Sequence, residues 1–200
     1  MCENCESVLD KIEFFCESCG WPLEISSSFC KHCTEKHNFN YIYFMFFYRG
    51  PIRALVKEIK FNNNVRAIYY FKKLINSVDL TMKINYDLIV SVPSHWLRKI
   101  ARLRHPSDII AKELSVKYGI PFEKVLKRKR FTKYQWKLGK GDRFRNVNGV
   151  FATNKKVKGL KILLVDDIYT TGATIEEASK VLKKADSGIV DCFVLSKSFI

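Results

Sequence analysis

The chain has 200 residues, of which 47% are hydrophobic, and a formal net charge of +15 at pH 7. A chain of this length suits one sizeable domain with a small appendage. Its longest apolar runs fall short of a membrane span, and its first residues lack a charged-then-apolar signal pattern, so we expect a cytoplasmic protein without membrane insertion.

The positive charge is concentrated in one part of the chain. Residues 95–161 contain 20 Lys and Arg against four acidic residues, whereas the rest of the chain is close to neutral. A basic segment of this kind indicates a polyanionic partner such as pyrophosphate or nucleic acid. The alternative is an ordinary solvated basic surface, because charge runs alone identify no partner.

Six of the seven cysteines form three Cys-x-x-Cys pairs near the start of the chain: Cys2 and Cys5, Cys16 and Cys19, Cys30 and Cys33. Each pair can give two thiolates to one tetrahedral ion, so two pairs complete a four-cysteine zinc site. A structural Zn²⁺ would supply the folding energy that so short a segment cannot gain from a core. We therefore expect a Cys-rich zinc-ribbon module over residues 1–38, in a reducing compartment.

The choice among the three pairs is open. We favour one ion held by the second and third pairs, because Gly20 directly after Cys19 suits the tight turn of a zinc knuckle. Six cysteines exceed one tetrahedral site, and two full four-cysteine sites would need eight ligands. His32 and His37 could supply the other two, although a histidine in such a segment is more often a surface residue. A redox role for the Cys-x-x-Cys pairs is the alternative, and the lack of a surrounding βαβ pattern argues against it.

The segment after the cysteines predicts strands and helices in alternation. Residues 41–48 are a continuous aromatic and aliphatic run, so we expect a strand buried on both faces, with a base-stacking platform as the alternative. An amphipathic helix is expected from Gly50, with one apolar face made by Ile52, Leu55, Val56 and Ile59. A second helix is expected over residues 65–77, and a buried strand over residues 88–93.

Basic residues follow that strand and dominate the middle of the chain. A helix is expected to start near Ser107. The later segment 127–151 interleaves aromatic rings with cations, which suits a mobile lid or a single-stranded nucleic-acid contact, although an ordinary exposed loop is the alternative. The candidate nucleic-acid-binding residues are Lys127, Arg128, Lys129, Arg130, Lys133, Trp136, Lys137, Arg143 and Arg145.

The most informative stretch runs from Ile162 to Thr174. Four aliphatic residues lead into Asp166 and Asp167, and a turn with the sequence Thr170-Thr171-Gly172-Ala173-Thr174 then opens a helix. Paired carboxylates at the carboxyl edge of a sheet can accept hydrogen bonds from two vicinal ribose hydroxyls. The N–H groups of the turn can bind a phosphate at the helix N-terminus.

This stretch resembles the type I phosphoribosyltransferase motif that binds 5-phosphoribosyl-1-pyrophosphate (PRPP). The resemblance implies an α/β domain over residues 39–200, with a parallel sheet flanked by helices. It implies that Asp166 and Asp167 hold the ribose and serve as catalytic residues, and that residues 170–174 bind the 5-phosphate. The basic residues Arg98 and Arg102 would lie on the pyrophosphate loop, where Mg²⁺ accompanies PRPP.

Local signals continue after the motif. Thr174 and Glu177 have the spacing of a capping box, and Glu176 and Lys180 have the spacing of an i,i+4 ion pair. Residues 189–195 predict a further strand. Its Cys192 is expected to be a core residue rather than a reactive one.

Over nearly its whole length the chain resembles the ComF family of competence proteins, which join a zinc module to a phosphoribosyltransferase-like domain. The resemblance is carried by Lys60-Phe61 and by the pattern Thr132-x2-Gln135-x2-Leu138-x4-Arg143-x2-Asn146-Val147-x-Gly149-x-Phe151. One region departs: the family has Arg-Gly-Phe-Asn-Gln where this chain has Arg102-Leu103-Arg104-His105-Pro106. The family resemblance implies natural transformation (DNA uptake), with cytoplasmic single-stranded DNA and other competence or DNA-processing proteins as partners.

Three functions follow from these features. The first is a PRPP-binding protein that contacts single-stranded DNA during transformation, which is the function we expect. The second is an active phosphoribosyltransferase of nucleotide metabolism that releases pyrophosphate from PRPP. The third is a PRPP-sensing regulator without turnover. No residue stands out as the reader of a nucleobase acceptor, so the question of catalysis stays open.

Overall fold

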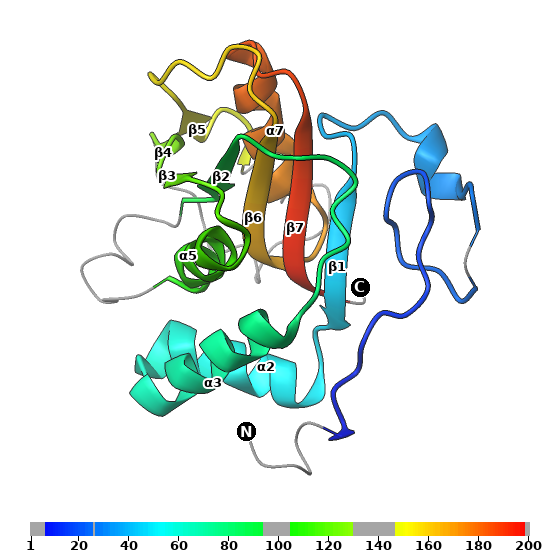
Figure 1. Ribbon diagram of the computed structural model, residues 1–200, viewed down its shortest axis with the longest axis vertical. Coiled ribbons are helices and arrows are strands. Elements are labelled where there is room, and N and C mark those ends of the chain that lie inside the picture. Colours follow the sequence, from blue (N-terminus) through cyan, green and yellow to red (C-terminus); the bar gives the residue numbers. More distant parts are fainter. Residues whose placement is uncertain (1–6, 26, 94–104, 130–146, 199–200) are drawn as a thin grey trace.

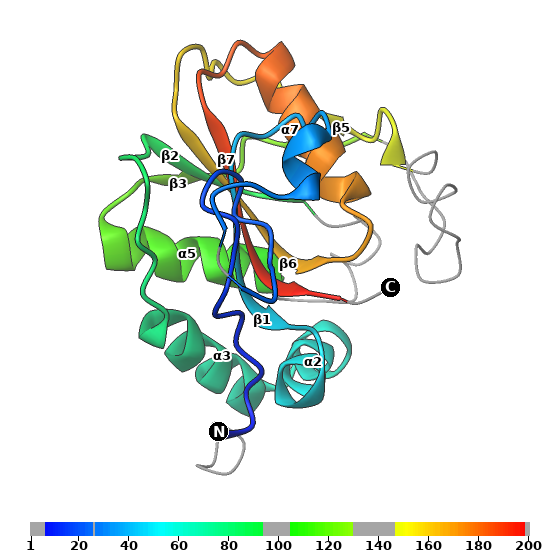
Figure 2. The same cartoon turned by 90° about the vertical axis from the view of Figure 1, so that its right-hand side faces the viewer.

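The computed structural model describes residues 7–25, 27–93, 105–129 and 147–198 (Figure 1). Its centre is a five-stranded parallel sheet in the order β1-β7-β6-β2-β3. The strands are β1 (Ile42–Phe47), β2 (Leu88–Ser91), β3 (Phe122–Glu123), β6 (Ile162–Tyr169) and β7 (Val190–Lys197). Helices cover both faces of this sheet, as Figure 2 shows, which confirms the predicted α/β architecture.

The helices divide between the two faces of the sheet. One face is covered by α2 (Gly50–Lys57), α3 (Val65–Ser77) and α5 (Pro106–Tyr118), and the other by α7 (Ala173–Lys184). Successive side chains of a strand point to opposite faces, so a central strand must be apolar on both. Leu163 packs with the first group of helices and Leu164 with α7. Burial of each such aliphatic side chain contributes roughly 1.5–3 kcal/mol.

The aromatic segment 41–48 provides β1, which pairs with β7 at the edge of the sheet. Four of its rings, Tyr41, Tyr43, Phe44 and Phe46, are buried, and Phe44 is only 5% exposed, so the core interpretation is confirmed over the base-stacking platform. The Tyr43 hydroxyl lies 3.2 Å from that of Tyr86, which donates to Asp191 at 2.6 Å. Cys192, fully buried on β7, is the core residue that the sequence predicted.

The helix that starts at Gly50 changes its form before Ile59. It ends at Lys57 and continues as the π-helical turn η2 (Glu58–Asn62), which Asn63 closes in the left-handed conformation. The Asn64 side chain then accepts two backbone hydrogen bonds and caps α3. A π turn widens the helix by one residue. It keeps Ile59 in the core and directs Lys60 toward β6.

The start of α7 differs from the predicted capping box. Its N-cap is Gly172, with a φ of 81°, and Thr174 lies inside the first turn. Glu177 accepts a hydrogen bond from the backbone of Gly149 at 2.8 Å and pairs with Lys180 at 3.7 Å. Glu176, expected to pair with Lys180, instead accepts hydrogen bonds from the N-terminal module. Both glutamates therefore make contacts with distant segments of the chain in place of the predicted local ones.

The N-terminal module lies beside the β1 edge of the sheet (Figures 1 and 2). It contains the short 3₁₀ turn η1 (Lys31–Thr34) and isolated bridges. The Ile42 backbone N–H donates to the Cys19 carbonyl at 3.0 Å, and Trp21 packs on the core beneath. Backbone pairing and apolar contact thus dock the module on the sheet.

The described part of the chain holds no helix that is both long and apolar enough to cross a bilayer.

Candidate functional site

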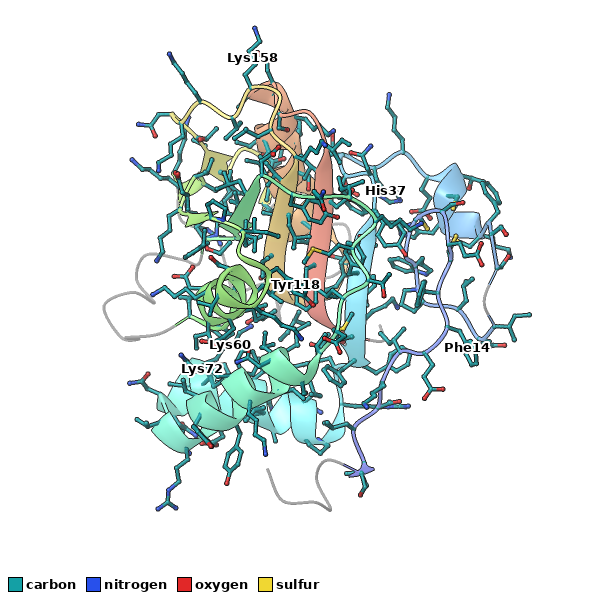
Figure 3. All side chains as sticks on the ribbon, viewed as in Figure 1. Phe14, His37, Lys60, Lys72, Tyr118 and Lys158 are labelled. Carbon is teal, nitrogen blue, oxygen red and sulfur yellow. The ribbon has the colours of Figure 1, made fainter. Side chains whose placement is uncertain are left out.

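The two predicted carboxylates lie at the carboxyl end of β6 and are nearly inaccessible: Asp166 is 8% and Asp167 is 5% exposed. The Ser107 hydroxyl, in the first turn of α5, donates to Asp166 Oδ1 at 2.9 Å, and the Asp167 N–H donates to the same oxygen. Lys60 Nζ lies 2.6 Å from Asp167 Oδ2, and Figure 3 shows Lys60 beside this end of the sheet. Groups from two helical elements therefore hold the acidic pair in place.

Burial and mutual repulsion change the chemistry of this pair. Burial raises the pKa of Asp166 to about 7, and the charge of Asp167 adds to that rise. Lys60, the Asp167 N–H and Ser107 act in the opposite direction and limit the rise. A buried acid that titrates near neutral pH is a typical feature of functional sites. Asp166 can therefore change its protonation state under physiological conditions.

The turn after β6 requires a glycine at one position. At Gly172 the φ of 81° is unfavourable for other residues, and a Cβ there would overlap the Tyr169 hydroxyl. The turn leads directly into α7, whose first N–H groups carry the positive end of the helix dipole. Thr170 and Thr171 are partly exposed beside it. The arrangement offers N–H and hydroxyl donors to an anion.

A cavity of about 740 Å³ lies between this turn and the N-terminal module. Thr170, Thr171 and Ala173 line it on one side, and His32, His37 and Trp21 on the other. Asp166 and Asp167 are not among its lining residues.

The second and third cysteine pairs meet in one cluster. The sulfur atoms of Cys16 and Cys33 are 3.5 Å apart, those of Cys19 and Cys30 3.6 Å, and those of Cys30 and Cys33 3.8 Å. Sulfurs on one tetrahedral zinc with bonds of about 2.3 Å are about 3.8 Å apart. The four free thiols therefore fit a single metal ion such as Zn²⁺, in the combination that the sequence favoured.

The backbone around the cluster is arranged as a zinc knuckle. Burial acts to raise the pKa of Cys16, but hydrogen bonds from the backbone of Cys19 and from the Cys33 side chain outweigh it and lower that pKa to about 7. Burial instead raises the pKa of Cys19 and of Cys30, so at these two positions a bound metal ion would have to stabilise the thiolate, the form that binds metal. Gly20 has a φ of 80°, and a Cβ there would overlap the Ile42 carbonyl. The glycine thus allows both the turn and its close docking on β1.

Lys127, Arg128 and Lys129 are the candidate nucleic-acid-binding residues that the structure describes. They lie on and beside the short strand β4 (Lys127–Arg128), which pairs antiparallel with β5 (Phe151–Ala152). Lys127 and Lys129 are exposed, whereas the Arg128 guanidinium lies over the ring of Phe151. Elsewhere in the basic stretch, Lys124 and Lys155 pair with Asp108 and Glu123. Part of the charge is therefore balanced within the protein.

Several predicted site residues lie outside the described residues. They are Cys2, Cys5, Arg98, Arg102, Arg130, Lys133, Trp136, Lys137, Arg143 and Arg145. Residues 102–104 of the departing pyrophosphate-loop segment and most of the pattern from Thr132 also lie there.

The sequence reasoning missed two residues that contact the acidic pair. The sequence marks Ser107 only as the start of a helix, and Lys60 only as part of a family pattern. One feature of the sequence could have drawn attention to Lys60. It follows the apolar face of one helix and comes shortly before Asn64, which caps the next helix. Which carboxylate it contacts depends on how η2 packs against the sheet.

Comparison with known proteins gives a domain match and a set of relatives. Residues 105–198 match the phosphoribosyl transferase domain family. The chain is 25% identical over 194 residues to Competence protein F of Haemophilus influenzae, covering 92% of this chain and 84% of that protein. It is 26% identical over 209 residues to the DNA utilization protein YhgH of Salmonella typhimurium, with 99% and 90% covered. Competence protein ComFC of Bacillus subtilis is 24% identical over 212 residues, with 99% and 84% covered.

Proposed function

Because this chain is a homologue of Competence protein F, YhgH and ComFC and contains a phosphoribosyl transferase domain, we propose that it binds PRPP and acts in natural transformation. The observation that carries the proposal is the buried Asp166–Asp167 pair on β6, the strand that a glycine turn joins to the N-terminus of α7. In this proposal the protein works in the cytoplasm and contacts single-stranded DNA there.

In this proposal different residues bind the ribose and the 5-phosphate of PRPP. Asp166 and Asp167 accept hydrogen bonds from the two vicinal ribose hydroxyls, while Ser107 and Lys60 keep the carboxylates oriented. The turn 170–174 binds the 5-phosphate through its N–H groups and the threonine hydroxyls. Mg²⁺ bound with PRPP neutralises charge on the pyrophosphate.

One observation favours the alternative of an active phosphoribosyltransferase. Asp166 has a pKa of about 7 and would lie beside the ribose, where a proton can be exchanged as a bond to the ring breaks. Release of pyrophosphate from PRPP, measured with candidate nucleobases as acceptors, distinguishes transfer from binding alone.

The contact with single-stranded DNA is supported by charge. The net charge is +15, and Lys127 and Lys129 are exposed just before a stretch of the sequence with further basic residues. Phosphate contacts by such residues release counterions, so affinity should fall steeply with salt concentration. Aromatic residues between the cations would add base stacking.

Calorimetric titration with PRPP and Mg²⁺ tests the proposal directly. The wild-type chain should bind saturably, whereas the double variant Asp166→Asn/Asp167→Asn should lose binding and keep its fold, because the substitutions preserve side-chain size. Asp186→Asn is the matched control, since Asp186 is exposed and its left-handed conformation suits asparagine. Unchanged PRPP affinity in the double variant would refute the site.

The same titration is repeated with a single-stranded oligonucleotide at two salt concentrations. Salt-sensitive DNA binding together with PRPP binding supports both parts of the proposal. DNA binding without PRPP binding would instead indicate a nucleic-acid module on a phosphoribosyltransferase frame. PRPP binding without DNA binding would remove the DNA contact from the proposal.

A further inference from the structure

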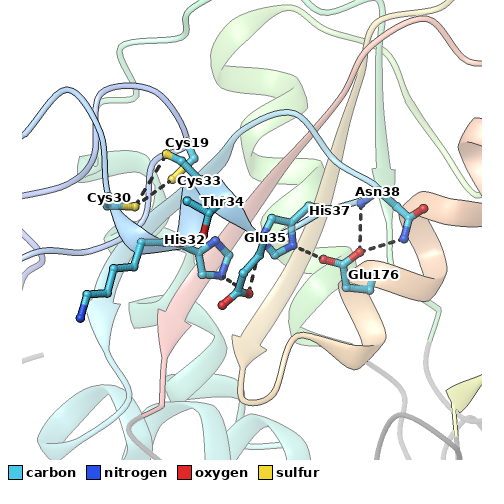
Figure 4. Close-up of polar contacts among 10 residues, drawn as sticks. Cys19, Cys30, His32, Cys33, Thr34, Glu35, His37, Asn38 and Glu176 are labelled. Carbon is cyan, nitrogen blue, oxygen red and sulfur yellow. Dashed lines mark hydrogen bonds and ion pairs between the residues drawn. The ribbon is translucent and has the colours of Figure 1, made fainter.

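Three metal-binding side chains meet beside the cavity, separately from the four cysteines. They are His32, Glu35 and His37, whose ligand atoms all lie within 4.8 Å of one another. Glu35 Oε2 is 3.8 Å from Nε2 of His32 and 3.8 Å from Nε2 of His37, as Figure 4 shows. Two ligand atoms on one tetrahedral ion with bonds of roughly 2.1 Å are about 3.4 Å apart. Small side-chain movements would therefore bring all three onto one ion.

His37 has the orientation of a metal ligand. Its Nδ1 donates a hydrogen bond to Glu176 Oε1 at 2.5 Å, so the lone pair is on Nε2. That Nε2 is buried and has no hydrogen-bond partner among the described residues. Histidines that bind metal usually donate their other ring N–H to a carboxylate, which fixes the tautomer and the ring orientation. Glu176 is itself held by two hydrogen bonds from Asn38.

His32 is buried in a stack of rings. Its side chain is 9% exposed and lies between Trp21, at a centroid distance of 3.7 Å, and His37, at 4.2 Å. Its Nδ1 has no hydrogen-bond partner within the part of the chain that the structure describes. A buried nitrogen without a partner is unfavourable, because it has lost its hydrogen bonds to water. The stack also places His32 Nε2 beside the Glu35 carboxylate, which makes Nε2 the candidate ligand atom of this ring.

We propose that His32, Glu35 and His37 form a second metal site, for a divalent transition-metal ion such as Zn²⁺. Imidazole ligands favour such ions over Mg²⁺. Two histidines and one glutamate leave coordination positions open, as in catalytic rather than structural zinc centres. All three side chains line the cavity that Thr170 and Thr171 also line, so a phosphate oxygen is a chemically suitable further ligand. The site does not depend on PRPP binding.

Metal binding would also change the ring stack. The rings of His32 and His37 are almost parallel, at 4°, and Glu176 holds His37, so the His32 ring must rotate before both lone pairs can point at one ion. This rotation alters the contact between His32 and Trp21. Tryptophan fluorescence should therefore change when the second ion binds, and the change should be lost in Trp21→Phe.

Titration of the full chain with Co²⁺ tests the site. Cys2→Ser/Cys5→Ser is used as the background, so that those thiolates cannot bind the second ion. We expect two equivalents, of which the first gives a thiolate-to-cobalt charge-transfer band and the second does not. His37→Gln and Glu35→Gln should each bind one equivalent with the thiolate band intact, which also shows that the four-cysteine cluster is folded.

The control variants are judged by the number of Co²⁺ equivalents bound and by the thiolate-to-cobalt band. Glu24→Gln, an exposed glutamate of the same module, should retain both equivalents. Glu176→Gln should bind the second ion roughly 10–100-fold more weakly, as loss of an orienting carboxylate does at other sites. The proposal is overturned if the background chain binds one equivalent only, or if both ligand variants keep the second one.

Discussion

For single residues, the acidic pair depends on partners that are distant in the chain. Asp166 and Asp167 were recognisable because they are adjacent and follow an aliphatic run. Lys60 and Ser107 come from different helical elements, and only the packing of η2 and α5 against β6 brings them to the carboxylates. Their effect is electrostatic: the cation and the hydroxyl limit the rise that burial imposes on the pKa of Asp166.

The pH dependence of stability follows from this pKa. Asp166 titrates near 7 in the folded protein and near 4 when unfolded, so the folded state holds the extra proton between these values. The contribution of Asp166 to stability is therefore full below about pH 4 and is lost as the pH rises toward 7. Asp166→Asn should remove this loss, so the variant should gain stability relative to the wild type as the pH rises from about 4 to about 7.

Chemical denaturation of the two proteins at several pH values measures the effect. Asp186→Asn controls for the loss of one carboxylate at the surface. Parallel stability curves for Asp166→Asn and the wild type across this range would mean that Asp166 is not buried as described.

Among the helices and strands, the start of α7 shows where local signals are insufficient. The turn and the helix were predicted from Thr170 onward, but the cap was not. A capping box depends on the φ and ψ angles of one residue, and here the left-handed conformation of Gly172 ends the strand and begins the helix. Glu177 then contacts Gly149, which belongs to a distant segment.

Gly172→Ala tests the geometry of this turn. The alanine should be strained by its positive φ and should also push against Tyr169. Gly159→Ala is the matched control, since Gly159 has a φ of 75° and no heavy atom lies within 4 Å of the position that an added Cβ would take. The control should lose about 1–2 kcal/mol of unfolding free energy from the backbone alone. Gly172→Ala should lose about 1–3 kcal/mol more from overpacking.

The measurement is urea denaturation of both variants, with PRPP titration of each. Equal losses of stability in the two variants would show that Tyr169 moves aside freely. Weaker PRPP binding is expected for Gly172→Ala only.

In the molecule as a whole, the N-terminal module is joined to the sheet and to α7. The Cys19 carbonyl accepts from β1, and Glu176 of α7 accepts from His37 and Asn38 (Figure 4). We propose residues 1–38 as a metal-folded module and residues 39–200 as the phosphoribosyltransferase-like domain. The contacts through Glu176 connect the module to the first turn of α7.

Metal removal tests this organisation. Chelation should unfold mainly residues 1–35, because the four-cysteine cluster supplies their folding energy. Hydrogen exchange should rise most there, to a smaller extent at the start of α7, and least in β6 and β7. Zn²⁺ should restore protection and Mg²⁺ should not. The zinc-ribbon interpretation fails if freshly purified, reduced protein contains no zinc.

Structural features that depend only on residues close together in the sequence could be predicted from the sequence alone. Aliphatic runs predicted the buried strands, apolar periodicity predicted α3, and the spacing of the second and third cysteine pairs predicted one metal cluster. The acidic pair and the turn after it were visible for the same reason. Each of these is a short pattern whose physical cause, side-chain burial or ligand spacing, acts over a few residues.

Which distant groups meet became clear only from the folded chain. The contact of Lys60 with Asp167, the hydrogen bonds from His37 and Asn38 to Glu176, and the cavity between module and turn all join separate segments. The strand order, with β1 beside the last strand β7, likewise joins segments that are distant in the sequence and was not predicted. Such contacts depend on how elements pack, because the sheet register and the docking of the module set distances that no local pattern contains.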